Sequence, residues 1–353
     1  MVALDSARFV LALVSRLAVC ERFHRSLNHG RAASWLDRKP ARPLGVSHTP
    51  APNLREHRPV PIHLDPLRSK TFPYPGRQAL LPSARVSFFD AGRGPDAMVF
   101  IHGLGGDFSH FEHIAPAFAA DHRIIGIDMP GCGASGPLSG RHSIERYADV
   151  VQELLTYLRV PRATLVGHSA GGQVVATVAA RDTGIVNRLV LINTAGLRSY
   201  NRATRSFARA LFRPTLLNAV LPPASTHILA NVFHTRNRYT AKFVVDSTQR
   251  PHHPLLRNMA RVFHDLMPDL LDATVVRHAP TLDLPVLLLW GGRDRLVPIE
   301  SVEHAARLFP RARLEVRHDC GHMPIIEHPE WTVARIREFI ASAPIHRGQA
   351  LAL

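Results

Sequence analysis

Lysine is nearly absent from this 353-residue sequence, which contains only Lys39, Lys70 and Lys242. Arginine therefore supplies nearly all of the positive charge, and the formal net charge is +15. An arginine bias that runs through a whole chain can follow from codon usage alone, so composition by itself identifies no partner. Nucleic-acid binding would need a basic face on a recognisable module, and the sequence contains none, so no nucleic-acid partner is expected.

Cysteine is also scarce. The three cysteines are Cys20, Cys132 and Cys320, and no two of them form a CxxC pair. An odd number without that spacing argues against a disulfide framework and against a zinc site. We therefore expect a cytoplasmic protein without a metal site, because a reducing compartment is the simplest setting for these thiols.

Near the N-terminus, no apolar run is long enough to indicate a membrane-spanning helix. The stretch ARFVLALVSRLAVC is interrupted by Arg16 and is followed by no small-residue cleavage motif, so a signal peptide is not expected either. On a helix over residues 5–26, Arg8, Ser15 and Arg22 would form one narrow polar stripe on an otherwise apolar surface. This pattern favours an interfacial helix with peripheral membrane contact. The alternatives are a helical arm docked on the protein, a frayed terminus or a start codon placed too far upstream.

Positive charge is concentrated in two segments. Residues 1–84 contain 13 Lys or Arg against 5 Asp or Glu, and residues 198–280 contain 12 against 4. This distribution suits attraction to an anionic membrane surface or to an anionic substrate. We predict a basic N-terminal extension over residues 1–84. Its ten prolines within residues 38–82 leave no room for a helix or a central strand and favour an extended linker.

Short apolar runs alternate with amphipathic stretches from Arg85 onward. The runs RVSFFDAG, AMVFIHG, RIIGIDMPG, ATLVGHS, RLVLINTAG and PVLLLWGGRD have the pattern of strands, and SHFEHIAPAFAA, SIERYADVVQELLTYL, AGGQVVATVAARD and SVEHAARLF have that of helices. The alternation predicts an α/β fold with a doubly wound, mostly parallel sheet, formed by residues 85–197 and 281–342. Residues 198–280 have helical patterns and no clear strand, which predicts a helical cap over the active-site face. Residues 343–353 are predicted as a tail.

The pentapeptide GHSAG at residues 167–171 matches G-x-S-x-G and lies between an apolar strand and a helix. Glycines flank Ser169 because the turn is sharp and larger side chains would collide with neighbouring elements. The turn exposes the serine hydroxyl, and the N-terminus of the next helix presents N–H groups to developing negative charge. Ser169 is therefore the predicted nucleophile, with an ordinary strand–helix turn as the alternative.

Asp294 and His322 are the predicted catalytic partners of Ser169. Asp294 lies in WGGRDRLVP just past an apolar strand, and His322 lies in DCGHMP just past RLEVRHD. The order serine, aspartate, histidine is the one expected for this turn. Carboxyl ends of parallel strands share one edge of a sheet, so the three groups can meet there. The preceding strand ends in Asn193, which cannot carry the charge that the orienting acid needs.

An oxyanion hole needs two N–H donors. The predicted donors are the amide of Ala170, directly after the nucleophile, and the amide of Leu104 in the glycine-rich loop HGLGGD at residues 102–107. Glycine loops also cradle phosphate, but this one lacks the Lys-Ser/Thr pair of a P-loop. Catalysis by these groups needs no metal or organic cofactor, and none is expected.

The motifs HGLGGD, DMPGCGASG, GHSAGG, WGGRDRLVP and CGHMP occur in an order and at a spacing that resemble the α/β-hydrolase superfamily from about Arg85 to Ala341. The resemblance implies an α/β-hydrolase fold with a helical cap insertion. It carries little information about the substrate. The chain departs from the family in its long basic extension and its arginine-rich cap.

Residues at a few motif positions indicate which branch of the superfamily the chain resembles. Epoxide hydrolases and haloalkane dehalogenases of this fold carry aspartate at the position of Ser169. Many carbon–carbon bond hydrolases have asparagine before the nucleophile and tryptophan after the histidine, where this chain has His168 and Met323. Cofactor-free haloperoxidase relatives have tryptophan and methionine where this chain has Leu104 and Ala170. The remaining branch is similar to serine carboxylesterases and lipases.

We expect a serine hydrolase that cleaves carboxylic esters of hydrophobic acyl groups, with a small-molecule or lipid ester as substrate. Substrate contact is predicted for His102, Gly103, His168, Phe207, Leu211, Phe212 and Phe233. Packing of the cap onto the core explains the apolar cap residues equally well. The alternatives are carbon–carbon bond hydrolysis or acyl transfer by the same triad, and a ligand-sensing binding protein of the same fold. The sequence predicts no oligomeric state.

Overall fold

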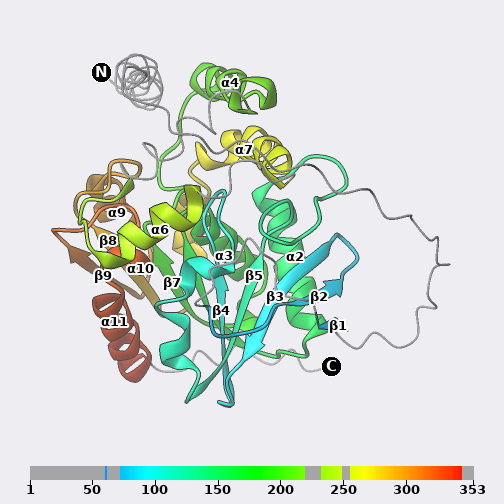
Figure 1. Ribbon diagram of the computed structural model, residues 1–353. Coiled ribbons are helices and arrows are strands. Elements are labelled where there is room, and N and C mark those ends of the chain that lie inside the picture. The colour runs from blue at the N-terminus through cyan, green and yellow to red at the C-terminus, as the bar shows by residue number, and fades with distance from the viewer. Residues whose placement is uncertain (1–59, 62–71, 219–231, 249–254, 344–353) are drawn as a thin grey trace, which may run out of the picture.

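A nine-stranded sheet forms the centre of the protein in the computed structural model, which describes residues 60–61, 72–218, 232–248 and 255–343 (Figure 1). The strand order is β1-β2-β3-β5-β4-β6-β7-β8-β9. The first three neighbouring pairs are antiparallel, and the five pairs from β5 to β9 are parallel. The predicted α/β fold with a mostly parallel sheet is therefore confirmed. The strands are β1 (Val60–Pro61), β2 (Arg77–Leu80), β3 (Arg85–Ala91), β4 (Asp96–Ile101), β5 (His122–Asp128), β6 (Ala163–His168), β7 (Val186–Ile192), β8 (Val286–Gly291) and β9 (Ala312–Arg317).

The central strands are apolar because both of their faces are covered. Every residue of β6, β7 and β8 is buried, as expected for parallel strands between two layers of helices. Successive side chains point to opposite faces, so Leu165 joins one hydrophobic cluster and Val166 joins the other. The sheet is thus a solid platform whose strand ends can hold side chains in fixed positions.

Helices contribute to both clusters. The first cluster includes apolar residues of α2 (Ile144–Tyr157), α3 (Ala170–Arg181) and α9 (Ile299–Ala306). The second includes residues of the 3₁₀ turns η1 (Phe108–Phe111) and η2 (Ala115–Phe118), and of α10 (Pro324–Glu327) and α11 (Pro329–Ser342). Two further 3₁₀ turns are η3 (Thr183–Ile185) and η4 (Ala279–Thr281).

Two local predictions were wrong. The stretch SHFEHIAPAFAA forms η1 and η2 in place of a continuous helix, because Pro116 lacks the N–H that an α-helix would need there. Within the proline-rich stretch, residues 77–80 form β2 and pair with β3, so the sheet begins before Arg85. RQAL can pair because no proline occurs between Pro75 and Pro82.

The described part of the segment between β7 and β8 consists of helices joined by loops. It contains α4 (Arg202–Leu211), α6 (Arg238–Thr248), α7 (Leu255–Leu270) and α8 (Thr274–His278), and no strand among residues 198–218, 232–248 and 255–280. Figure 1 shows α7 above one end of the sheet and α4 beyond α7. We call residues 198–280 the cap.

Several predictions fall outside the described residues. These are the interfacial helix at 5–26, most of the linker at 38–82 and residues 344–353 of the tail. Within the described part of the chain, none of the helices combines the length and the apolar character needed to span a bilayer.

Candidate active site

Ser169 occupies a strained turn between β6 and α3. Its φ and ψ are 54° and −118°, a combination that residues with a Cβ rarely adopt. A Cβ on Gly167 would lie 2.4 Å from the carbonyl oxygen of Gly171, and a Cβ on Gly171 would lie 2.2 Å from the carbonyl oxygen of Ile101. Both glycines are therefore required by the close approach of the backbone segments around Ser169.

The structure brings Ser169, His322 and Asp294 into one hydrogen-bonded chain. Ser169 Oγ lies 3.0 Å from His322 Nε2, and His322 Nδ1 lies 2.8 Å from Asp294 Oδ2. The side chains of His322 and Asp294 are 7% and 0% exposed, so water competes little for these bonds. A carboxylate only accepts, so Nδ1 carries the proton and Nε2 is free to accept the serine hydroxyl proton.

Asp294 is held by three further donors. Its Oδ1 accepts from the amides of Leu296 (2.7 Å) and Val297 (3.1 Å), and its Oδ2 accepts from Asn193 Nδ2 (2.7 Å). Asn193 is fully buried with a φ of 43°, and its Oδ1 accepts from the amide of Gly291 at 3.1 Å. The side-chain amide of Asn193 is therefore fixed in the orientation that donates to Asp294. The sequence singled out Asn193 only as an uncharged residue and missed this contact.

Glu327 anchors the loop that carries His322. Its buried carboxylate accepts from the amides of Gly321 (2.9 and 3.0 Å) and Met323 (3.2 Å), which flank His322. It also accepts from the amides of His234 and Thr235 in the cap, both at 2.8 Å. One carboxylate thus joins the histidine loop to the cap. The sequence analysis did not identify Glu327, and no motif points to it.

The two predicted oxyanion donors, the amides of Leu104 and Ala170, both belong to residues in the wall of the cavity beside the nucleophile turn. Within the described part of the chain, the amides of Leu104 and Ala170 make no recorded hydrogen bond. A Cβ on Gly103 would lie 3.0 Å from the Cβ of Ser169, so the glycine loop packs directly against the nucleophile. This approach requires a glycine before Leu104.

His102 was predicted to contact substrate, but its ring is engaged in the loop. Nδ1–H donates to the carbonyl of Gly103 at 2.7 Å, and Nε2 accepts from the amide of Met129 at 2.9 Å. Burial lowers the pKa of His102, so the ring is neutral and can serve as donor and acceptor at once. Its position indicates that it holds the glycine loop to the end of β5.

His168 makes a similar internal contact. Its Nε2–H donates to the carbonyl of His322 at 2.9 Å, and the two rings lie 5.0 Å apart. Burial and the neighbouring His322 lower the pKa of His168 well below its usual value. A neutral His168 therefore supports the backbone of His322, which is a different task from the predicted substrate contact.

The predicted cap residues differ in where they lie, and Phe233 directly follows Val232, whose carbonyl accepts from the amide of His322 at 3.0 Å. Phe207 is 56% exposed, and Leu211 and Phe212 pack in a cluster between α4 and α7. Phe233 packs against Phe243, with ring centroids 5.6 Å apart. The apolar character of Phe207, Leu211 and Phe212 thus fits packing within the cap or exposure, which was the alternative weighed for them. Phe233 belongs to the core cluster that includes Met323.

A narrow apolar cavity lies beside the nucleophile turn. Its free volume is about 10 Å³, and α7 of the cap contributes Val262 and Leu266 to its wall. The rest of the wall is His102, Gly103, Leu104, Met129, Cys132, Tyr147, Ala170, Gly171 and Val174. α7 also covers the glycine loop, since a Cβ on Gly105 would lie 2.8 Å from the ring of Phe263. Besides Asn193 and Glu327, the sequence therefore did not reveal the residues of α7 that lie over the site.

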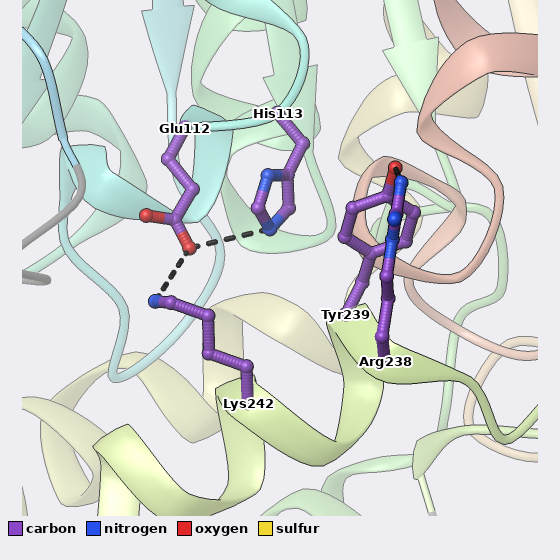
Figure 2. Close-up of a pocket in the computed structure, with 5 residues that line it drawn as sticks. All are labelled: Glu112, His113, Arg238, Tyr239 and Lys242. Atoms are coloured by element: carbon purple, nitrogen blue, oxygen red, sulfur yellow. Dashed lines mark hydrogen bonds and ion pairs between the residues drawn. The ribbon is translucent and has the colours of Figure 1, made fainter.

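A wider hollow of about 280 Å³ lies between the loop after η1 and α6 (Figure 2). Glu112 and His113 face Arg238, Tyr239 and Lys242 across it. Lys242 Nζ lies 3.3 Å from Glu112, and the guanidinium of Arg238 lies 4.7 Å from the centroid of the Tyr239 ring. The pair of Lys242 and Glu112 spans the hollow, which is therefore a polar junction between core and cap and contains no member of the Ser169 site.

No cluster of three or more histidine, cysteine or acidic side chains suited to a metal ion occurs among the described residues. Cys132 and Cys320 are both buried, and burial raises the pKa of the Cys132 thiol to about 12. Neither thiol is therefore reactive at neutral pH.

Residues 96–329 match the family model of the alpha/beta hydrolase fold. The dihydrolipoyllysine-residue acetyltransferase component of an acetoin cleaving system from Pseudomonas putida is 29% identical over 70% of this chain, and the chain spans 64% of that relative. The 2-hydroxymuconate semialdehyde hydrolase of Pseudomonas putida is 28% identical over 76% of this chain and 95% of its own length. A thermophilic esterase from Thermogutta terrifontis has a similar fold, with a TM-score of 0.64, 21% identity, and coverage of 75% of this chain and 98% of the esterase.

The family match extends from β4 to the start of α11 and contains the nucleophile turn, Asp294 and His322. It confirms the resemblance inferred from the five sequence motifs. The chain belongs to the α/β-hydrolase fold family.

Proposed function

We propose that the protein is a serine hydrolase that cleaves carboxylic esters of hydrophobic acyl groups. One observation carries the proposal, namely the chain from Ser169 Oγ through the imidazole of His322 to Asp294, with distances of 3.0 and 2.8 Å. The strained backbone of Ser169 supports it, because φ and ψ values of this kind persist where function requires them.

In the first half of the reaction, Ser169 Oγ attacks the ester carbonyl while its proton passes to His322 Nε2. The new imidazolium is stabilised by Asp294, which stays ionised. The amides of Leu104 and Ala170 donate to the oxyanion of the tetrahedral intermediate. His322 then gives the proton to the departing alcohol, which leaves an acyl group on Ser169.

In the second half, His322 removes a proton from a water molecule that attacks the acyl carbonyl. The second tetrahedral intermediate uses the same two amides. When it collapses, His322 returns the proton to Ser169 Oγ and the carboxylic acid leaves. Every proton transfer thus runs through His322 Nε2, which the bond from Nδ1 to Asp294 keeps unprotonated in the resting state.

The acyl group is proposed to enter the apolar cavity beside Ala170. The cavity volume of about 10 Å³ is close to that of a single water-sized probe, so a longer chain requires α7 to move outward. Val262 and Leu266 are the residues it would displace. Acyl-length preference is therefore proposed to depend on these two positions of α7.

Carbon–carbon bond hydrolysis is the second candidate. It is favoured by the 28% identity to 2-hydroxymuconate semialdehyde hydrolase over nearly all of that relative. Against it, His168 and Met323 occupy the positions where the sequence resemblance implies asparagine and tryptophan in many enzymes of that kind.

A chain-length series of p-nitrophenyl esters, assayed with native protein and with Ser169→Ala, tests the proposal. We expect native turnover with saturation and loss of nearly all activity in the variant. Equal background rates in the two proteins would refute serine ester hydrolysis. An assay with 2-hydroxymuconate semialdehyde distinguishes ester hydrolysis from carbon–carbon bond hydrolysis. If the protein turned over that compound and none of the esters, the triad would be assigned to carbon–carbon cleavage. Product analysis with an added alcohol separates hydrolysis from acyl transfer.

A further inference from the structure

The outer surface of the cap combines arginines with exposed apolar side chains. Phe207 on α4 is 56% exposed, and Leu216, shortly after the helix, is 44% exposed. Arg202, Arg209 and Arg213 are exposed too, and the helical period places Arg202 and Arg209 on the opposite flank of α4 from Phe207. We call these five residues the α4 face. In Figure 1, α4 lies farther from the sheet than α7 does.

The inner side of α4 already satisfies the packing of the helix. Ala208, Phe212 and Leu217 are nearly buried and form a cluster with Ala260 and Met267 of α7. The N-terminus of α4 is capped by the side chain of Asn201, which accepts from the amide of Thr204 at 2.9 Å. Phe207 and Leu216 are therefore not needed to hold α4 in place and are available for contact with a partner.

Positive charge on this surface has little internal compensation. No aspartate or glutamate occurs in the sequence between Asp182 and Asp246. Arg205, at the edge of the face, lies 3.6 Å from Asp272. Among the described residues, Arg202, Arg209 and Arg213 pair with no carboxylate, and Arg209 Nε donates to His264 Nε2 at 3.4 Å. Like charges one helical turn apart repel one another, so the face is suited to an anionic partner.

The charge of the rest of the chain limits the choice of partner. A second copy of a chain with a net charge of +15 would be repelled, and residues 1–84 are themselves basic. An anionic polymer such as DNA would satisfy the arginines and leave Phe207 and Leu216 in water. A lipid surface with anionic headgroups satisfies both, since arginines meet phosphates and the two apolar side chains enter the layer below.

We propose that the α4 face docks the protein on an anionic lipid surface. The position of the face gives this contact a consequence for the site. α4 packs on α7, where the rings of Phe212 and Phe263 stack with centroids 6.5 Å apart. Phe263 in turn lies against Gly105 of the glycine loop. Lipid bound at α4 is therefore separated from the active-site loops by one helix, and the docking itself does not depend on the reaction at Ser169.

Vesicle flotation of the full-length protein tests the proposal. The probes are vesicles of phosphatidylcholine alone and vesicles of equal parts phosphatidylcholine and phosphatidylglycerol. We expect binding to the anionic vesicles only, and a fall in affinity with added salt because the attraction is screened. The triple variant Arg202→Glu/Arg209→Glu/Arg213→Glu should lose at least about tenfold in affinity. Phe207→Ala/Leu216→Ala should also bind more weakly, but with a salt dependence like that of the native protein.

The matched control is Arg93→Glu/Arg307→Glu/Arg311→Glu, which changes the net charge equally at exposed arginines outside the cap. Circular dichroism and the unfolding midpoint show whether each variant is folded. Equal vesicle affinity of the two triple variants would overturn the proposal, because net charge or another part of the chain would then carry the binding. Equal binding to neutral vesicles, or tighter binding to duplex DNA than to anionic vesicles, would also overturn it.

Discussion

The side-chain amide of Asn193 donates a 2.7 Å hydrogen bond to the same carboxylate oxygen of Asp294 that receives Nδ1–H of His322. β7 delivers Asn193 and β8 delivers Asp294, so two neighbouring strand ends position a single acceptor. Asn193 contributes an oriented dipole and no charge. The charge that stabilises the imidazolium therefore comes from Asp294 alone.

Asn193→Asp is expected to move the acid limb of kcat/KM for an aryl ester to higher pH. The two side chains have nearly the same shape, so the main change is a second carboxylate in contact with Asp294. A second ionised carboxylate in contact with Asp294 raises the local negative charge. Added negative charge favours the protonated form of His322, so the active, neutral form appears at higher pH. The measurement is kcat/KM as a function of pH in both proteins.

The predicted shift separates a positioning role from a structural one. A residue that only supports the fold would lower activity by the same factor at every pH. Asn193→Asp should also lower the neutral-pH rate by about tenfold, the scale set by one hydrogen bond to a charged group. An unchanged pH profile would show that Asn193 does not act on the triad.

Glu327→Gln is expected to lower kcat more than it raises KM and to destabilise the protein by about 2 kcal/mol. A neutral amide accepts more weakly than a carboxylate, and its NH₂ group would face backbone N–H donors. The loop of His322 and the segment at His234 would both lose a charged acceptor. Steady-state kinetics and urea unfolding measure the two effects.

Glu300→Gln is the control for Glu327→Gln, because Glu300 is exposed on α9. It should leave the kinetics and the free energy of unfolding close to the native values. If Glu327→Gln lowered the free energy of unfolding while kcat/KM stayed native, the contacts of Glu327 would be structural only. The idea that Glu327 positions His322 would then be wrong.

The parts of the site that sequence reasoning found are those in which a local pattern determines the geometry. The G-x-S-x-G turn needs only neighbouring residues, and Asp294 and His322 each follow a strand whose end is fixed by the parallel sheet. Glu327 differs, because it meets His234 across 93 residues of sequence. No local pattern could predict that contact, although Glu327 follows His322 by only five positions.

The cap shows the same limit. Amphipathic spacing predicts which cap residues are apolar, but several faces of a helix can bury them. Phe212 packs on α7 and Phe207 is exposed, whereas Val262 and Leu266 line the cavity. The direction of each side chain depends on how α4 and α7 pack together, which is a tertiary property.

Leu266→Ala is expected to shift the acyl-length preference toward longer esters. Leu266 lines the narrow cavity beside Ala170 and is nearly buried, so its truncation enlarges the space that the acyl chain is proposed to enter. The lost packing should lower the free energy of unfolding by about 2–5 kcal/mol. Relative kcat/KM over an ester series of increasing chain length is the measurement.

Val245→Ala provides the comparison for Leu266→Ala, since Val245 is 50% exposed on α6. It should keep the native chain-length profile. An identical profile for Leu266→Ala would remove the cavity from the account of specificity and leave the acyl site to another surface.

His142 is expected to make the folded protein less stable in mild acid. It is fully buried, and burial lowers its pKa from 6.5 to about 4. Between these values the unfolded chain binds a proton that the folded protein excludes, so stability falls as the pH drops from about 6.5 to 4. The contribution of this one group is about 3 kcal/mol over that range.

His142→Gln isolates this contribution, because glutamine does not titrate. The Nδ1 atom of His142 lies 3.1 Å from the Tyr147 hydroxyl, which donates to the carbonyl of Pro130 at 2.7 Å, and the amide of glutamine can replace that donor. The free energy of unfolding is measured with urea at pH 7 and at pH 4.5 in both proteins. Other titrating groups act equally in the two, so the native protein should lose more stability than the variant by a margin of the order of 2–3 kcal/mol. Equal losses would mean that His142 is protonated in the folded state without cost, in conflict with its complete burial.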